Sequence, residues 1–167
     1  MTRLHFPGAL LCALMLCLVA SAATSAAPII AAAGRWAAIR GPDHCEAASL
    51  SELPASATRA QGRASLSFDR VRHGELALKL SRPTRPGASV MLTIGPTPFL
   101  LVARGALAWS RGPAQEAALI DAMREGDAMR IEARSVSGGR FVDRYLLAGA
   151  PTAIDAAAAC AVTLARG

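Results

Sequence analysis

The amino-acid sequence predicts a mainly β fold, an antiparallel β-sandwich with one central and one C-terminal helix. Short segments in which apolar and polar residues alternate follow one another at regular spacing, as expected of half-buried strands. Glycine and proline separate these segments, and only one helical segment lies between two strands. An α/β fold would need a helix between most successive strands, so the pattern favours the sandwich.

The first strands are expected in pairs. GRWAAIR (34–40) and CEAASL (45–50) form a weaker opening pair, preceded by a flexible amino-terminal tail over residues 27–33. RASLSFD (63–69) and ELALKL (75–80) place every second side chain, all apolar, on one face. The glycine in the connecting RVRHG then predicts a hairpin between them.

Two more strands and both helices follow. SVMLTI (89–94) and PFLLVA (98–103) are separated by a glycine and proline break. PAQEAALIDAMREG (113–126) begins with proline, repeats apolar residues at helical spacing and ends at glycine, which predicts the central helix. TAIDAAAACAV (152–162) opens with a Thr-x-x-Asp capping box and predicts the C-terminal helix. Together with a last hairpin, these elements form one domain over residues 34–167.

The last hairpin is expected to turn at Gly138 and Gly139. Its strands are MRIEARS (129–135) and RFVDRYLL (140–147), and adjacent glycines favour a two-residue turn. That turn gives the cross-strand pairs Ser137 with Arg140, Arg134 with Asp143, and Glu132 with Tyr145.

In this register the two faces of the hairpin have different roles. The face expected to join the core carries Met129, Ile131, Val142 and Leu146. The opposite face is the candidate binding surface, and it consists of Arg130, Arg134, Phe141 and Tyr145. Arginine beside aromatic residues is typical of recognition surfaces. The alternative is that a helix or another strand covers the two aromatic rings.

The amino terminus resembles a secretory signal peptide. Arg3 precedes the apolar run FPGALLCALMLCLVA, and small residues follow in SAATSAAP, which is the order of charge, core and cleavage site. Cleavage is expected after Ala22 or Ala26, so residues 1–26 are assigned to the signal. The apolar core is shorter than a spanning helix requires. We therefore expect a periplasmic or secreted protein without a transmembrane anchor after cleavage.

Two cysteines remain after the predicted cleavage, Cys45 and Cys160, because Cys12 and Cys17 lie within the signal. In an oxidising compartment an even number of cysteines favours a disulfide. A catalytic thiol would need an activating base, and a zinc site would need closely spaced ligands that the sequence does not offer. The prediction is a Cys45–Cys160 disulfide, with no metal and no cofactor.

The charge of the chain limits the possible partners. Without Arg3, 17 basic and 12 acidic residues remain, and Lys79 is the single lysine. This excess favours an anionic envelope polymer or an acidic protein as partner. The basic residues are scattered along the chain, which is also typical of a solvated surface. Nucleic acid is not expected as a partner.

The order of features resembles the invasion-associated locus B family of exported bacterial proteins, as a distant member. The resemblance rests on Trp36 near the start of the domain, Cys45 soon after it, and a central helix followed by a hairpin. The best match is IDAMREGDAMRIEARSVSGGRFVDRYLLAGAPTAIDAA, and the chain departs from the family by lacking cysteines where VARGALAWSRG stands. The resemblance implies an immunoglobulin-like sandwich and no known enzymatic activity, and it transfers no functional site.

These observations favour a non-enzymatic, exported binding or envelope-associated module. One alternative is a periplasmic hydrolase or hydrolase inhibitor that uses His44 or His73, in which Asp43 with Ser49 or Ser51 would complete a catalytic set. No GxSxG motif supports such a set. A second alternative is a purely structural envelope component.

Overall fold

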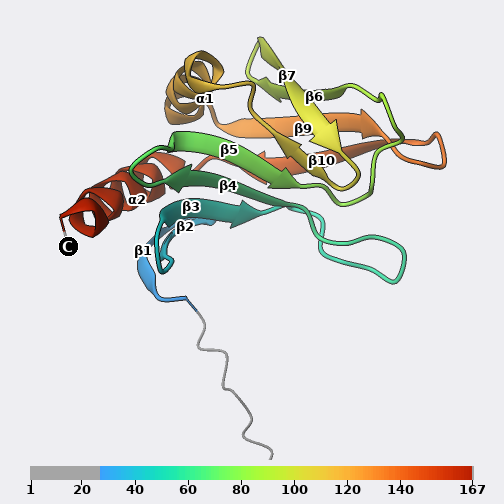
Figure 1. The fold of residues 1–167 in the computed structure, drawn as a ribbon. Helices are drawn as coiled ribbons and strands as arrows, with labels where there is room; N and C mark the ends of the chain where they lie inside the picture. Colours follow the sequence, from blue (N-terminus) through green and yellow to red (C-terminus); the bar gives the residue numbers. More distant parts are fainter. Residues whose placement is uncertain (1–26, 167) are drawn as a thin grey trace, which may run out of the picture.

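The computed structural model describes residues 27–166, and within them ten strands form one antiparallel sheet in the order β1-β2-β3-β4-β5-β8-β7-β6-β9-β10 (Figure 1). The strands are β1 Ile29–Ala33, β2 Trp36–Arg40, β3 Cys45–Leu50, β4 Arg63–Phe68, β5 His73–Lys79, β6 Val90–Ile94, β7 Thr97–Arg104, β8 Leu107–Trp109, β9 Ala128–Arg134 and β10 Arg140–Leu146. The helices are α1 Pro113–Glu125 and α2 Ala150–Ala165. The predicted signal peptide over residues 1–26 lies outside the described residues.

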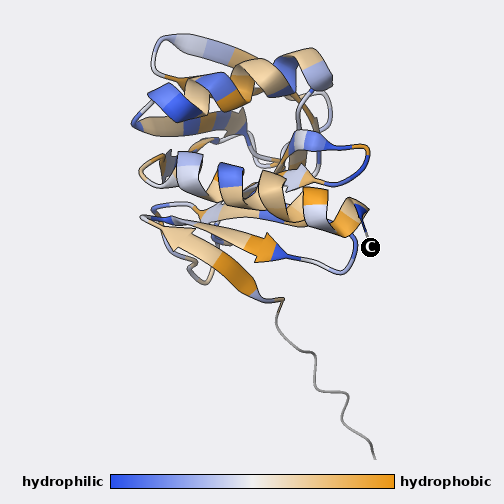
Figure 2. Ribbon diagram, turned by 90° about the vertical axis from the view of Figure 1, so that its left-hand side faces the viewer, coloured by the Kyte–Doolittle hydropathy of each residue, from blue (hydrophilic) through white to orange (hydrophobic). Residues whose placement is uncertain are grey.

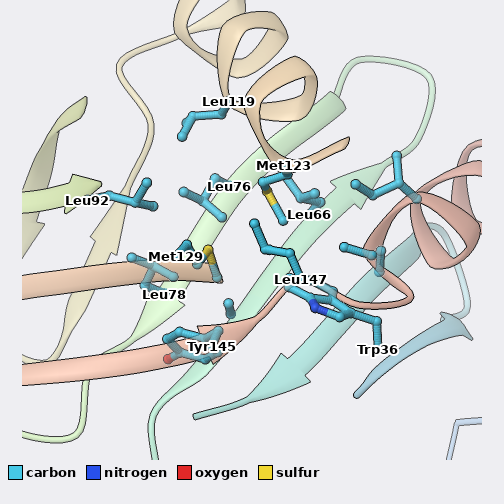
Figure 3. Close-up of a cluster of buried hydrophobic side chains, with 14 of the residues drawn as sticks. Trp36, Leu66, Leu76, Leu78, Leu92, Leu119, Met123, Met129, Tyr145 and Leu147 are labelled. Carbon is cyan, nitrogen blue, oxygen red and sulfur yellow. The ribbon is translucent and has the colours of Figure 1, made fainter. Parts of the chain in front are cut away.

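Strand β7 joins two halves of the sheet. Its first part, Thr97–Leu101, pairs with β6, whereas Val102–Arg104 pairs with β8. One half therefore contains β1 to β5 with β8, and the other contains β6, β9 and β10. Side chains from both halves meet in one core, where Tyr145 lies beside Met129, close to Leu78 (Figure 3). Trp36 is fully buried at one end of this core. Its Nε1 donates a hydrogen bond to the Leu146 carbonyl oxygen at 2.8 Å.

Both helices lie on the same side of the sheet (Figure 2). Helix α1 begins at Pro113 and ends where the N–H of Gly126 donates to the Ala122 carbonyl oxygen at 2.9 Å. Its side chains Leu119 and Met123 point into the core (Figure 3). Helix α2 buries a row of small side chains, which allow the helix backbone to come close to β1, β2 and β3. The mainly β class with a central and a C-terminal helix is confirmed.

The flexible tail predicted for residues 27–33 is wrong, because Ile29–Ala33 forms the edge strand β1 and pairs with β2. The β1–β2 turn packs against the turn between β10 and α2, where a Cβ at Gly149 would lie 1.9 Å from the Ala33 carbonyl oxygen. Gly149 also has a φ of +90°, which favours glycine. Two turns that are distant in the sequence thus fix the amino-terminal strand.

Two other expectations need correction. Strand β8, Leu107–Trp109, lies in a segment for which no strand was predicted, and it joins β5 to β7. The capping box at Thr152 and Asp155 does not form, because α2 already begins at Ala150 and has no side-chain cap. Asp155 instead accepts a hydrogen bond from Arg124 of α1 at 2.5 Å. None of the helices in the described part of the chain is long and apolar enough to span a membrane.

Candidate functional site

The outer face of the β9–β10 hairpin gathers arginine side chains. Strand alternation turns Met129, Ile131, Phe141 and Tyr145 inward, so the residues between them point outward. We name this outer surface the arginine face, and it consists of Arg130, Glu132 and Arg134 on β9 and Arg140, Val142 and Arg144 on β10. The four arginine side chains are exposed, whereas Glu132 and Val142 are half-buried.

The register of the hairpin places these arginines in two directly opposed pairs. Arg134 lies opposite Arg140, and Arg130 lies opposite Arg144. Like charges at directly opposed positions destabilise a sheet. The two pairs are four residues apart along each strand, which corresponds to about 13 Å. Glu132 and Val142 form the single cross-strand pair of outward side chains between them.

Glu132 holds one arginine from each pair. Its Oε1 accepts a hydrogen bond from Arg140 Nε at 2.6 Å, and its Oε2 forms an ion pair with Arg130. The hydrogen bond from Arg140 and the nearby positive charges lower the pKa of Glu132 below its usual value, so the carboxylate is ionised at neutral pH. Among residues 27–166, Arg134 and Arg144 form no ion pair with a carboxylate.

A hollow of about 440 Å³ adjoins the Arg134–Arg140 pair. We name it the loop hollow, and it is lined by Arg85, Gly87, Ala88, Ser89, Glu132, Ala133, Arg134 and Arg140. Three guanidinium groups and one carboxylate therefore surround this space. Arg85, like Arg134, has no ion pair within the described part of the chain.

The loop that supplies Arg85 is anchored to the hairpin. The N–H of Ser81 donates to Asp143 Oδ2 at 2.8 Å, and the N–H of Arg85 donates to the Arg134 carbonyl oxygen at 3.4 Å. An isolated β-bridge between Thr84 and Ser135 adds a further connection. In Figure 1 this loop lies beside the β9–β10 turn, at the end of the sheet away from both helices. These contacts hold the backbone at Arg85 next to the arginine face.

A second hollow, of about 490 Å³, adjoins the Arg130–Arg144 pair. We name it the strand-end hollow, and it is lined by Glu52, Thr93, Gly95, Ala128, Met129, Arg130, Arg144 and Leu146. The N–H of Glu52 donates to the Arg144 carbonyl oxygen at 2.8 Å, which fixes the backbone of Glu52 at the edge of β10. This hollow therefore combines two arginines, a carboxylate and a hydroxyl group.

The predicted composition of the binding surface is partly wrong. Arg130 and Arg134 are exposed, but Phe141 is 8% and Tyr145 is 1% exposed. Both rings lie on the inner face, so neither can take part in the surface predicted from the sequence. Burial raises the pKa of the Tyr145 hydroxyl above its usual value, and the charge of Asp143 raises it further.

The error comes from the turn. Only Gly138 of the two glycines has a positive φ, +86°, so the type I′ turn, which requires a positive φ at both central positions, does not form. The connection is a longer loop instead, closed by the N–H of Ser135 donating to the Gly139 carbonyl oxygen at 2.9 Å. Arg140 consequently pairs with Arg134 rather than with Ser137. A shift by an odd number of residues moves every side chain to the other face.

Four further residues of the arginine face and the two hollows were not predicted from the sequence. Arg140 and Arg144 are four residues apart on one strand, and this even spacing would have placed them on one face in any register. Arg85 and Glu52 carry no such signal, because they reach the hairpin from segments distant in the sequence.

The disulfide is confirmed, since Cys45 and Cys160 lie at bonding distance with their Cα atoms 6.1 Å apart. It links β3 to α2, and Cys45 is fully buried.

The hydrolase residues are not brought together. His44 Nδ1 lies 2.9 Å from Asp43 Oδ1, and this hydrogen bond lowers the pKa of Asp43. Ser49 lies toward the other end of β3, about 17 Å along the strand from His44, and its hydroxyl donates to the Arg35 carbonyl oxygen. Ser51 donates to the Leu53 carbonyl oxygen. His73 lies exposed at the start of β5.

Between residues 27 and 166 no cluster of three His, Cys, Asp or Glu side chains is suited to hold a metal ion. Comparisons with protein-family models, with curated proteins and with solved structures find no match. The geometry of the arginine face is therefore the main source of a functional hypothesis.

Proposed function

We propose that the protein is a non-enzymatic binding protein of the bacterial envelope or exterior that recognises an anionic partner through the arginine face. The observation that carries this proposal is the placement of Arg134 opposite Arg140 and of Arg130 opposite Arg144. Such pairs reduce the stability of the sheet. A bound anion would relieve that repulsion, because it adds negative charge beside Arg134 or Arg144, which form no ion pair with a carboxylate within residues 27–166.

The loop hollow is the better anion site of the two. Arg85, Arg134 and Arg140 line it against a single carboxylate, that of Glu132. Guanidinium groups donate two parallel hydrogen bonds to phosphate or carboxylate oxygens, which gives both affinity and orientation. Glu132 already holds Arg140 in place, so one donor group is positioned before the anion arrives and less conformational entropy is lost on binding.

The proposed compartment is the periplasm or the exterior of the cell. The disulfide between Cys45 and Cys160 supports it, because disulfides persist in oxidising compartments. The signal peptide predicted from the sequence supports the same location. Distant membership of the invasion-associated locus B family belongs to this proposal and rests on the sequence resemblance alone.

We also propose that the fold is an immunoglobulin-like sandwich. The two half-sheets that meet across one core support its layered character. Strand β7 pairs with β6 in one half and with β8 in the other, and it thereby joins the two halves at one edge.

The proposed partner is an anionic envelope polymer or an acidic protein, and inorganic pyrophosphate serves as a probe for the site. We expect pyrophosphate to change the backbone amide chemical shifts of residues around the loop hollow. The double variant Arg134→Ala/Arg140→Ala should weaken this binding by at least about tenfold, as expected for the loss of two charge-assisted hydrogen bonds. Added salt should weaken the native interaction as well.

The matched control is the double variant Arg104→Ala/Arg111→Ala. It removes the same charge from exposed positions that line neither hollow. The control should bind pyrophosphate with nearly native affinity. Equal weakening in both double variants would show that only the net charge matters, and the arginine face would then not be a specific site.

A further inference from the structure

The strand-end hollow differs from the loop hollow in containing opposite charges that do not pair. Glu52 lines it together with Arg130 and Arg144, yet in the described residues Glu52 forms no ion pair with either arginine. The backbone of Glu52 is fixed by its hydrogen bond to the Arg144 carbonyl oxygen. The hollow is therefore lined by an acidic residue and two basic residues, and within residues 27–166 the acidic residue forms no ion pair with either of them.

This combination fits hydroxyl groups better than it fits a second anion. Glu52 can only accept hydrogen bonds and Arg144 can only donate them, whereas a hydroxyl group does both. A second phosphate or carboxylate in this hollow would be repelled by the Glu52 carboxylate. Thr93 adds one hydroxyl that can donate or accept. The lining thus matches a neutral group that carries several hydroxyls.

The surface between the two hollows also suits a neutral segment. Val142 is the outward residue of β10 between Arg140 and Arg144, and it is half-buried. It offers an apolar contact for the C–H face of a sugar ring. The Arg134–Arg140 pair and the Arg130–Arg144 pair are about 13 Å apart along the strands, which is longer than one sugar ring.

We propose that the ligand is an acidic oligosaccharide whose anionic group occupies the loop hollow and whose neutral sugars extend over Val142 into the strand-end hollow. This inference rests on the proposed function, since it places the anion in the same loop hollow. It goes further by assigning the ligand an orientation, with its charged group at one end and its neutral sugars at the other. A polymer with an anion on every unit would instead meet Glu132 and Glu52 along the same path.

The test uses probes with one phosphate and an increasing number of neutral sugars: inorganic phosphate, glucose 1-phosphate, maltose 1-phosphate and maltotriose 1-phosphate. We expect affinity, measured by titration calorimetry, to rise about tenfold from glucose 1-phosphate to maltotriose 1-phosphate, which corresponds to one or two net hydrogen bonds. The variant Glu52→Ala should lose this gain and keep its affinity for inorganic phosphate. The control Glu125→Ala removes an exposed carboxylate that lines neither hollow, and it should keep the gain.

Tripolyphosphate provides the opposite comparison, because it carries charge along its whole length. Glu52→Ala should bind tripolyphosphate more tightly than the native protein does, since a repulsive carboxylate is removed. Phosphate binding without a gain from added sugars, or a gain that survives Glu52→Ala, would overturn this inference and leave the proposed function intact. Failure of every phosphate probe to bind would overturn both.

Discussion

Arg134 and Arg140 lie directly opposite each other on β9 and β10, and both side chains are exposed on the outer face of the hairpin. Glu132 binds Arg140 but not Arg134. The hairpin therefore contains a repulsive pair that its own residues only partly neutralise. Burial of the inner face, where Tyr145 lies opposite Met129, supplies the free energy that outweighs this repulsion.

Replacement of Arg134 by glutamate should stabilise the protein and impair binding. Arg134→Glu converts the repulsion with Arg140 into attraction, so we expect the free energy of unfolding to rise by about 0.5 kcal/mol. Urea denaturation at low salt measures the change, and high salt should reduce it. Pyrophosphate affinity should fall in the same variant. The control Arg104→Glu changes the charge equally outside both hollows, and equal stabilisation by it would contradict a role for the opposed pair.

The ion pairs of Glu132 should make stability depend on pH. The folded-state pKa of Glu132 lies below its ordinary value of 4.5, so its contribution is fully present above about pH 4.5 and is lost as the pH falls through the folded-state pKa. At neutral pH the native protein should be more stable than Glu132→Gln by less than about 1 kcal/mol, because the partners are exposed. Urea denaturation of both proteins at a series of pH values tests this. A difference that stays constant below pH 4.5 would contradict it.

Gly62 and Tyr145 should be energetically coupled. A Cβ at position 62 would lie 2.7 Å from the Tyr145 hydroxyl oxygen and 3.1 Å from Asp143 Oδ2. Gly62→Ala should therefore destabilise the fold by about 1–3 kcal/mol, as crowding in a packed core does. In the background Tyr145→Phe, which lacks the hydroxyl, the same substitution should cost less. A double-mutant cycle by urea denaturation gives the coupling, and additive effects would show that the hydroxyl is not the obstacle.

The sequence predicted most of the strands because their alternation is local. In β4 the inward side chains Ala64, Leu66 and Phe68 are all buried, as expected. The same reasoning failed for the faces of the last hairpin, because both faces of β10 carry apolar side chains. The inner face also carries the charged residue Asp143. Asp143 can be buried because the N–H of Ser81 donates to it. That contact joins residues far apart in the chain, so alternation alone does not reveal it.

The candidate site was predictable only where one strand carries it. Arg130 and Arg134 share a face in any register because they are separated by an even number of residues. The loop hollow also needs Arg85, and the strand-end hollow needs Glu52. Both come from loops whose path depends on backbone hydrogen bonds to β9 and β10. The spacing of residues in the sequence does not predict that these loops contact the hairpin.

The disulfide should account for a large part of the stability. Cys45 and Cys160 are separated by 115 residues, and closing so long a loop restricts the unfolded chain by close to 5 kcal/mol in the chain-entropy model. We expect the double variant Cys45→Ala/Cys160→Ala to lose about 2–5 kcal/mol of unfolding free energy, since native strain and residual structure reduce the ideal value. The double variant avoids an unpaired thiol. Urea denaturation of oxidised native protein and of the variant gives the loss.

Amide hydrogen exchange should show which elements lose stability when the disulfide is removed. The disulfide joins β3 to α2, and α2 also packs on β1 and β2, so amide protection in α2 should fall more than protection in β9 and β10. Reduced native protein is the control, because it keeps both sulfur atoms and should resemble the variant. Its mass should differ from that of the oxidised protein by two hydrogens. Free thiols on both cysteines of the native protein, or unchanged stability in the variant, would show that the bond does not stabilise the fold.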